Sequence, residues 1–199
     1  MTRPLILAST SAIRQIMLRN ACVEFEARPA RIDEDAIKAS LLAEGAKPRE
    51  IADALAEGKA RKIAKKEPGA LVLGCDQVLD LKGKLFSKPR SIEEAGAQLA
   101  ELSGQTHKLL SAAVLYEEGK PVWRHIGEAR LSMRILSPAY QADYLSRNWE
   151  SIRSSVGCYK LEEEGVRLFA RVEGSNFTVL GLPLVEFLSY LTLRGDLAG

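Results

Sequence analysis

The sequence predicts an α/β protein built on a mixed sheet. Two apolar runs, at residues 4–9 and 70–74, have the length and composition of buried strands, and each lies next to a segment with helical periodicity. Residues 106–135 instead alternate loosely and bend at 118–121, which indicates two long antiparallel strands. Because βα units and hairpins occur in one chain, we expect a mixed sheet with helices, in one domain or in two small lobes that share a cleft.

Capping residues and helix breakers mark the expected helices. They are expected at 12–20 after Ser9-Thr10-Ser11, within 31–45, at 49–66 before Pro68-Gly69, from Ser91 to about Gly104, from Ser137-Pro138 onward, and from Pro183 onward. Further strands are expected in a hairpin around Lys82-Gly83-Lys84, at 166–172 and at 176–180.

Composition excludes several classes of protein. The chain of 199 residues is 46% hydrophobic and carries a net charge of +2, so charge predicts neither a nucleic-acid nor a membrane partner. Its three cysteines are far apart and show neither zinc spacing nor a disulfide framework, which fits a reducing cytosol. The apolar start at residues 4–8 is too short for a signal peptide, and no stretch approaches a membrane span.

The first candidate site is the start of the helix at residue 12. The N–H groups of a first helical turn are free and the helix dipole is positive there, so Ser9, Ser11 and Arg14 can bind an anion. The guanidinium of Arg14 adds a planar fork suited to phosphate oxygens. The segment lacks the GxxxxGK[ST] pattern and is not a P-loop. A plain capped helix with a surface arginine explains the same residues.

Lys59 is the second candidate. On a helical wheel it lies near the middle of the apolar face that includes Ile51, Leu55 and Ile63. A lysine in this position either extends its ammonium to solvent or meets an anion.

Asp76 follows the apolar run 70–74, and ligands of α/β sheets bind at the carboxyl ends of strands. Its carboxylate can orient a metal or accept a proton from water, and a turn-forming aspartate is the alternative. Lys88 precedes a proline in a stiff loop, which would hold its ammonium beside Asp76 or leave it solvated. The acidic run 33–35, which includes Glu34, is either a source of a metal ligand or a solvated turn.

The order and spacing of these signals resemble the Maf family. The matching segments cover nearly the whole chain and are Leu5–Arg14, Ile32–Glu34, Leu55–Ala60, Gly74–Gln77, Lys88-Pro89, Leu102–Gly104, Gly157–Glu162 and Val179–Pro183. The resemblance implies an elongated α/β fold with two lobes around a central cleft, similar to inosine triphosphate pyrophosphatases, and a single Maf-like domain over residues 1–199. It also implies a cytoplasmic house-cleaning enzyme, in some relatives a homodimer, that uses Mg²⁺ or Mn²⁺ to hydrolyse a nucleoside triphosphate to a monophosphate and pyrophosphate.

Residue roles are carried over only at matching positions. The resemblance implies Asp76 as the catalytic acceptor and, with Glu34, as a contributor to the metal site. The implied substrate-binding residues are Ser9, Arg14, Lys59 and Lys88. The implied determinants of base specificity are Ile13, Gln77 and Glu162.

The chain also departs from the family pattern. Many relatives have two consecutive arginines near position 13, where this chain has Ile13 before a single arginine. The usual Gly-Ala-Asp-Thr is Gly-Cys-Asp-Gln at 74–77, and the usual Ala-Gly before the late tyrosine is Val-Gly-Cys at 156–158. Gln77 together with Glu162 resembles the subfamily acting on 7-methyl-GTP, whose members carry tryptophan at the position of Ile13.

In the expected reaction, water reaches the α-phosphorus through a shell of negative oxygens. Arg14, Lys59 and Lys88, with a divalent cation, would neutralise the charge that develops on pyrophosphate. Asp76 would either deprotonate the water or hold it on the metal. Two rival functions fit the same residues: a non-catalytic nucleotide-binding regulator of cell division, and a phosphatase that acts at the γ-phosphate and releases orthophosphate.

Overall fold

The computed structural model describes residues 3–198 and contains one mixed seven-stranded sheet. The order across the sheet is β2-β1-β3-β5-β6-β7, and β4 pairs with the far part of β3. The strands are β1 Leu5–Leu7, β2 Glu26–Ala27, β3 Leu71–Leu81, β4 Lys84–Phe86, β5 Thr106–Glu117, β6 Lys120–Met133 and β7 Phe169–Glu173. Strands β2, β1 and β3 pair in parallel, and all other pairs are antiparallel. The predicted mixed sheet is therefore confirmed.

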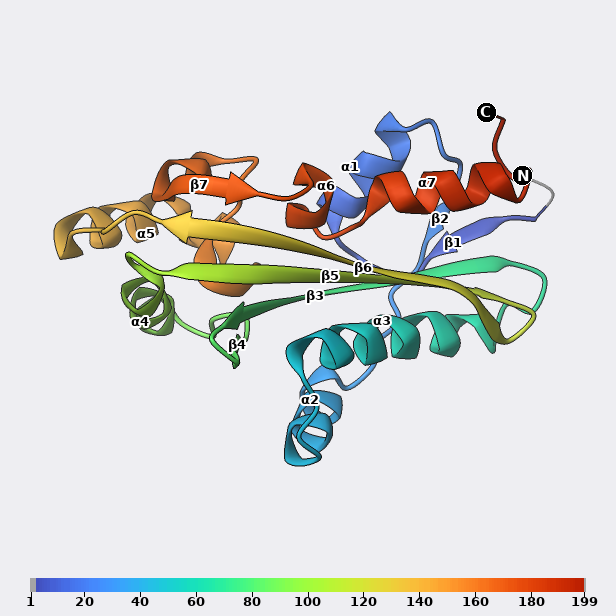
Figure 1. The fold of residues 1–199 in the computed structure, drawn as a ribbon, viewed down its shortest axis with the longest axis horizontal. Coiled ribbons are helices and arrows are strands. Elements are labelled where there is room, and N and C mark those ends of the chain that lie inside the picture. The colour runs from blue at the N-terminus through green and yellow to red at the C-terminus, as the bar shows by residue number, and fades with distance from the viewer. Residues whose placement is uncertain (1–2, 199) are drawn as a thin grey trace.

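The three longest strands give the molecule its elongated shape (Figure 1). Strands β3, β5 and β6 have 11, 12 and 14 residues and lie side by side. Both predicted hairpins form at residues with positive φ: Lys82 and Gly83 connect β3 to β4, and Glu118 and Gly119 connect β5 to β6. A tight reversal needs such left-handed residues, and this explains why these short polar segments interrupt the strands.

The helices are α1 Ala12–Asn20, α2 Glu34–Ala43, α3 Pro48–Ala64, α4 Ile92–Leu102, α5 Pro138–Ile152, α6 Asn176–Val179 and α7 Leu184–Leu193, with 3₁₀ turns η1 Val156–Cys158 and η2 Glu164–Leu168. Three of them begin at the predicted serine caps: the side chains of Ser11, Ser91 and Ser137 each accept a hydrogen bond from the backbone N–H three residues later.

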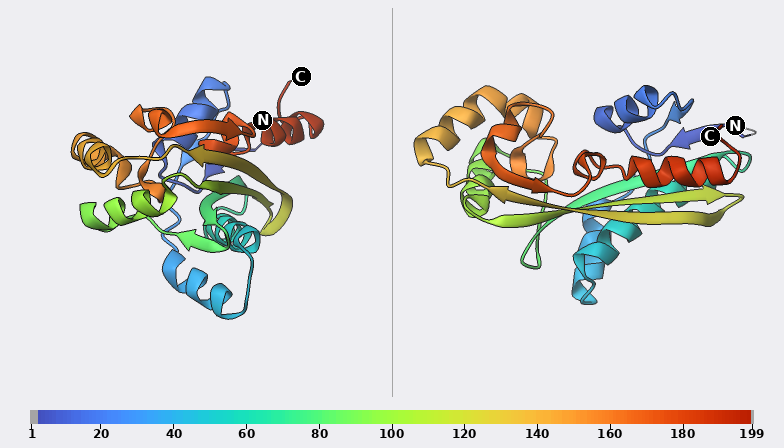
Figure 2. Two further views of the ribbon diagram at one scale, coloured as in Figure 1. Left: turned by 60° about the vertical axis from the view of Figure 1, so that its left-hand side comes forward. Right: turned by 45° about the horizontal axis from the view of Figure 1, so that its top comes forward.

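Helices cover both faces of the sheet near β1 and one end of the long strands (Figures 1 and 2). Helix α3 packs on one face in a cluster with residues such as Ile6 and Val72, and α1 and α7 pack on the other face with Leu7 and Leu73. A third apolar cluster joins α4 and α5 to the far ends of the strands. Successive residues of β1 and β3 thus face different helices, and this is why these strands are apolar throughout.

The segment 176–180 is helical and not a strand as predicted. Its apolar and β-branched residues favour a strand locally, but they form α6, which lies against β5 and β6. Thr178 fits this position because it faces Gly127, where a Cβ would lie 2.3 Å from its Oγ1. The strand predicted at 166–172 starts only at Phe169, since η2 occupies the residues before it. In both places tertiary packing overrides local propensity.

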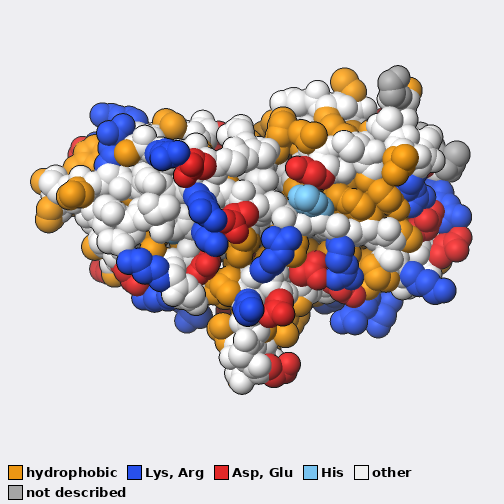
Figure 3. All heavy atoms as spheres, in the orientation of Figure 1, with side chains coloured by type: hydrophobic (Ala, Val, Ile, Leu, Met, Phe, Trp, Pro, Cys, Tyr) orange, Lys and Arg blue, Asp and Glu red, His pale blue; other side chains and the backbone are white. Residues whose placement is uncertain are grey.

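No helix within residues 3–198 is long and apolar enough to cross a membrane. On the face in Figure 3, basic and acidic side chains are interspersed, in keeping with the small net charge.

Candidate active site

The site begins at a short unpaired edge of β3. Strand β1 pairs with β3 only up to Leu73, and β4 pairs with the same strand only from Leu79. Over residues 74–78 no described strand covers this edge, while β5 pairs along the opposite edge throughout. The carboxyl end of β1 and the first turn of α1 lie at this gap. Ligands of α/β proteins typically bind at the carboxyl end of a parallel strand, and here that end lies beside the longer strand β3.

Asp76 lies inside β3, opposite Ala112 of β5, and not just past the strand as the sequence suggested. The antiparallel ladder with β5 continues to Asp80, so the strand extends well beyond its apolar beginning. Because side chains alternate along a strand, Asp76 points to the α3 face and Gln77 to the α6 face. The two residues therefore flank the open edge from opposite faces of the sheet.

Gly74 allows α3 to approach β3 closely. A Cβ at this position would lie 2.1 Å from the carbonyl oxygen of Ala56 and 2.6 Å from the nitrogen of Ala60. Only glycine leaves room for the helix at this distance. The close approach places Lys59, one residue before Ala60, over the carboxylate of Asp76.

Lys59 contacts two carboxylates from different elements. Its Nζ lies 2.6 Å from Oδ1 of Asp76 and 2.9 Å from Oε1 of Glu34, the first residue of α2. The side chain of Lys59 is 12% exposed and that of Asp76 is 7% exposed. The prediction left Lys59 open between extending to solvent and meeting an anion, and the structure shows that it meets two.

The surroundings shift the two carboxyl groups in opposite directions. Burial raises the pKa of Asp76, while the positive charges of Lys59 and Arg14 oppose this shift. Burial would also raise the pKa of Glu34, but the attraction of Lys59, with smaller contributions from Lys88 and Lys38, outweighs it and lowers that pKa. The rise in the pKa of Asp76 is in the direction that favours a group that accepts a proton.

Arg14 is fixed at the carboxyl end of β1. Its Nη1 donates to Oγ of Ser9 at 3.3 Å and to the carbonyl oxygen of Cys75 at 3.1 Å, and its Nε donates to the carbonyl oxygen of Gly181 at 2.7 Å. None of the hydrogen bonds among the described residues uses Nη2, which remains available to an anion. Ile13, one residue earlier on α1, is half-buried.

Gln77 is held by β5 and α6. Its Nε2 lies 2.9 Å from Oγ of Ser111, 3.1 Å from the carbonyl oxygen of Thr178 and 2.9 Å from that of Val179. Ser111 and Thr178 were not among the predicted site residues. A serine inside the otherwise apolar run 109–116 is a signal that could have identified Ser111, whereas no local signal marks Thr178.

The remaining predicted residues lie at the margin. Lys88 is exposed and its charge reaches Glu34, but no hydrogen bond or ion pair of the described residues joins it to Asp76, beside which it was expected. Glu162 is exposed in the turn before η2, and no such contact joins it to Gln77 or Ile13. The structure thus brings together Ser9, Arg14, Glu34, Lys59, Asp76 and Gln77.

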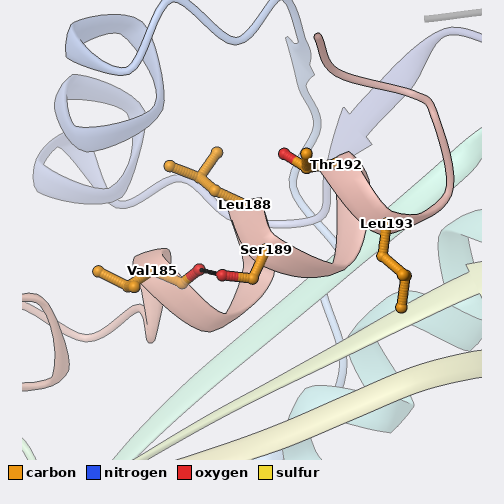
Figure 4. Close-up of a pocket in the computed structure, with 5 residues that line it drawn as sticks. All are labelled: Val185, Leu188, Ser189, Thr192 and Leu193. Atoms are coloured by element: carbon orange, nitrogen blue, oxygen red, sulfur yellow. Dashed lines mark hydrogen bonds between the residues drawn. The ribbon is translucent and has the colours of Figure 1, made fainter. Parts of the chain in front are cut away.

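Two cavities lie elsewhere. A surface depression of about 540 Å³ is formed by one side of α7, by Val185, Leu188, Ser189, Thr192 and Leu193 (Figure 4). A second, of about 360 Å³, is lined by Arg134, Ile135, Leu136, Ser137, Tyr140 and Arg167. Neither contains a residue of the site above. The two cavities therefore do not mark the candidate active site. The charged side chains that converge at the β3 edge mark it instead.

The carboxylates of Asp76 and Glu34 fit a divalent cation of the magnesium type. Within residues 3–198, no group of three or more Asp, Glu, His or Cys side chains forms a complete protein cage. Mg²⁺ does not need one, because it binds through one or two carboxylates and takes its other ligands from water and substrate phosphates. Oδ2 of Asp76 makes none of the hydrogen bonds of the described residues, so it is available for this purpose.

The comparisons with known proteins agree with the resemblance found in the sequence. Residues 4–193 match the family model described as Maf-like protein. The chain is 63% identical over 195 residues to the nucleoside triphosphate pyrophosphatase of Ruegeria pomeroyi, with 98% of each chain covered, and 64% identical over 197 residues to that of Roseobacter denitrificans, with 99% of each covered. It is 46% identical over 199 residues, 100% of both chains, to the 7-methyl-GTP pyrophosphatase of Mesorhizobium japonicum. The chain belongs to the Maf family.

Proposed function

We propose that this chain is a nucleoside triphosphate pyrophosphatase that hydrolyses the bond between the α- and β-phosphates. The observation that carries the proposal is the buried carboxylate of Asp76, whose pKa is raised by burial and whose Oδ1 lies 2.6 Å from Lys59, beside the pinned guanidinium of Arg14. A basic carboxylate next to two cationic groups suits attack of water on a polyanion. Family membership and the names of the relatives support the same reaction.

Basic side chains of the chain itself neutralise most of the negative charge of the phosphates. Arg14 and Lys59 bind the phosphates at the β3 edge, and Lys88 approaches from its exposed loop. Asp76 accepts the proton of the attacking water or holds that water in line with the α-phosphorus. Asp76 and Glu34 would hold Mg²⁺ or Mn²⁺, which supplies further neutralisation of the leaving pyrophosphate.

For the base, we propose a purine with 7-methyl-GTP as the leading candidate. Guanine has hydrogen-bond donors at N1–H and N2–H₂, and the side-chain oxygens of Gln77 and Glu162 can accept hydrogen bonds from them. Methylation at N7 makes the ring cationic, so a carboxylate gains attraction that a neutral side chain would not provide. Two relatives at 46% identity bear the name 7-methyl-GTP pyrophosphatase, whereas the relatives at 63% and 64% bear the general name. Ile13 cannot stack on the ring as an aromatic side chain would.

The deciding experiment identifies the products. The purified chain is incubated with Mg²⁺ or Mn²⁺ and a panel of nucleoside triphosphates, and pyrophosphate and orthophosphate are measured separately. We expect a nucleoside monophosphate and pyrophosphate in equal amounts. Orthophosphate as the first product would indicate attack at the γ-phosphate, and tight nucleotide binding without any product would favour a regulator of cell division.

Three further expectations accompany this function. We propose that residues 1–199 act as one Maf-like domain, which the match over residues 4–193 supports. We place the enzyme in the cytoplasm, since Cys22, Cys75 and Cys158 are all free thiols. A homodimer is compatible with the exposed apolar side chains of α7, and size-exclusion chromatography with light scattering tests it.

A further inference from the structure

One short segment, residues 178–181, anchors two site residues that lie on different elements. The carbonyl oxygens of Thr178 and Val179 accept hydrogen bonds from Gln77 on β3. The carbonyl oxygen of Gly181 accepts a hydrogen bond from Arg14 on α1. The end of α6 therefore fixes Arg14 and the side-chain amide of Gln77, which both lie at the β3 edge.

These contacts favour one of the two orientations of the Gln77 amide. Backbone carbonyl oxygens only accept hydrogen bonds, so the atom that meets Thr178 and Val179 must be the amide nitrogen. Rotating the amide by 180° would set Oε1 against two other oxygens. Oε1 has no partner among the described residues and is not one of the buried unpaired atoms, so it reaches solvent.

Ser111 enforces the same polarity from β5. It is fully buried and lies opposite Gln77 in the strand register. Its hydroxyl donates to the carbonyl oxygen of Thr178 at 2.6 Å, so its own oxygen is left to accept from Nε2 of Gln77 at 2.9 Å. A hydroxyl that has already donated its hydrogen cannot satisfy Oε1.

We propose that Ser111 is a positioning residue that acts with the backbone carbonyls of Thr178 and Val179, so that Gln77 presents its carbonyl oxygen, and not its amide nitrogen, to the base. The inference rests on the proposed function, because the nucleotide base is the ligand in question. The preferred base must then offer an N–H donor at this point, as the N1–H and amino group of guanine do. A base edge with only acceptors at that point is selected against, since it would meet an oxygen.

The first test measures the wild-type chain with GTP, inosine triphosphate, which lacks the amino group, and 1-methyl-GTP, which lacks the N1–H. Pyrophosphate release is followed for each. We expect kcat/KM to fall roughly 3- to 10-fold for at least one analogue, the scale of one neutral hydrogen bond. Equal kcat/KM for all three nucleotides would overturn the proposal. If none of them released pyrophosphate, the proposed function itself would fail, so the two failures are distinguishable.

The second test uses Ser111→Ala with a matched control. Ser132→Ala removes a hydroxyl from the same pair of strands, where Ser132 pairs with Thr106 on the exposed side and away from the site. We expect Ser111→Ala to reduce the ratio of kcat/KM between GTP and the affected analogue by about 3-fold or more, through KM and with little change in kcat. Ser111→Thr, which keeps the hydroxyl, should restore the ratio. A Ser111→Ala variant that retained the wild-type ratio, as Ser132→Ala should, would contradict the assignment.

Discussion

The ammonium of Lys59 lies 2.6 Å from the carboxylate of Asp76 and is shared with that of Glu34 at 2.9 Å. When both carboxyl groups are ionised, these three side chains together carry one net negative charge, with the guanidinium of Arg14 nearby. In a buried setting that charge attracts a cation more strongly than it would in water. Lys59 opposes the rise in the pKa of Asp76 that burial causes and lowers the pKa of Glu34, and the remaining negative charge can attract a divalent cation.

The first prediction concerns Asp76→Asn. Asparagine keeps the shape of the side chain and can still accept a hydrogen bond from Lys59, but it loses the charge and the basicity. We expect turnover to be nearly abolished while the thermal unfolding temperature changes little. If the variant retained more than about a tenth of the wild-type kcat/KM, a loss of roughly 1.4 kcal/mol or less, Asp76 would not be the acceptor.

The second prediction concerns Lys59→Met, which keeps the aliphatic stem and removes the charge. If Lys59 binds phosphate as proposed, the transition state should lose about 2–3 kcal/mol of stabilisation, because its side chain is only 12% exposed. Lys88→Met should also reduce kcat/KM but depend more on salt, because Lys88 is exposed. Lys66→Met, a change at an exposed lysine beyond α3, is the control and should leave the kinetics unaltered. Wild-type kinetics in Lys59→Met would show that Lys59 has only a structural role.

Local chemistry predicted most of the fold. The starts of α1, α4 and α5 depend on a serine and the residues just after it, so they could be found from the sequence. The segment 176–180 could not, because α6 is stabilised by contacts with strands β5 and β6 that are distant in the chain.

The site also has a part that the sequence predicted and a part that it did not. Asp76 and Lys59 were identified individually, since each is a charged residue in an apolar setting. The contact of Lys59 with Glu34 and the hydrogen bond of Gln77 to Thr178 join residues up to 101 positions apart, and the periodicity of a sequence carries no information on such pairs. The sequence also ended the strand too early, because the ladder that extends it past Asp76 is provided by β5.

The third prediction tests the close approach of α3 to β3. Gly74→Ala would place a Cβ 2.1 Å from the carbonyl oxygen of Ala56, so the helix must move. We expect the free energy of unfolding to fall by roughly 1–3 kcal/mol, and kcat/KM to fall as well because Lys59 moves with the helix. Gly69→Ala is the matched control, since a Cβ there meets nothing within 4 Å. A Gly74→Ala variant as stable and active as Gly69→Ala would contradict this account of the site.

The fourth prediction concerns pH and His107. This histidine is buried, bonds to the hydroxyl of Tyr159 through Nε2 at 2.7 Å, and has a pKa lowered by burial to about 4. Between pH 4 and the unfolded value of about 6.5 the unfolded chain binds more protons, so stability rises with pH in this window and is lost as pH falls. The contribution is on the order of 3 kcal/mol. His107→Gln keeps a hydrogen-bonding group without titration.

Chemical denaturation at several pH values measures the effect. The dependence of the unfolding free energy on pH between 4 and 6.5 should be smaller in His107→Gln than in wild type. His125→Gln provides a comparison at the other histidine, which is only partly buried and stacks on Trp123. An unchanged slope in His107→Gln would mean that other groups cause the acid sensitivity.

The last prediction concerns the choice of base by Glu162. Its carboxylate is exposed in the turn before η2, so an interaction with a nucleotide base would not carry the desolvation cost that burial imposes. A cationic 7-methylguanine ring should gain from this charge, whereas GTP should gain only the hydrogen bond. Because Ile13 offers no aromatic face, the preference for 7-methyl-GTP over GTP should be smaller than in relatives with tryptophan there.

The measurement is kcat/KM for 7-methyl-GTP, GTP, UTP and dTTP on wild type and on Glu162→Gln. The variant should lose most of the preference for 7-methyl-GTP and show weaker salt dependence with it, since the interaction removed is one between charges. Glu150→Gln removes an exposed carboxylate on α5 and should leave the ranking intact. A wild type that prefers dTTP or UTP, or an unaltered ranking in Glu162→Gln, would refute this specificity while leaving the pyrophosphatase reaction in place.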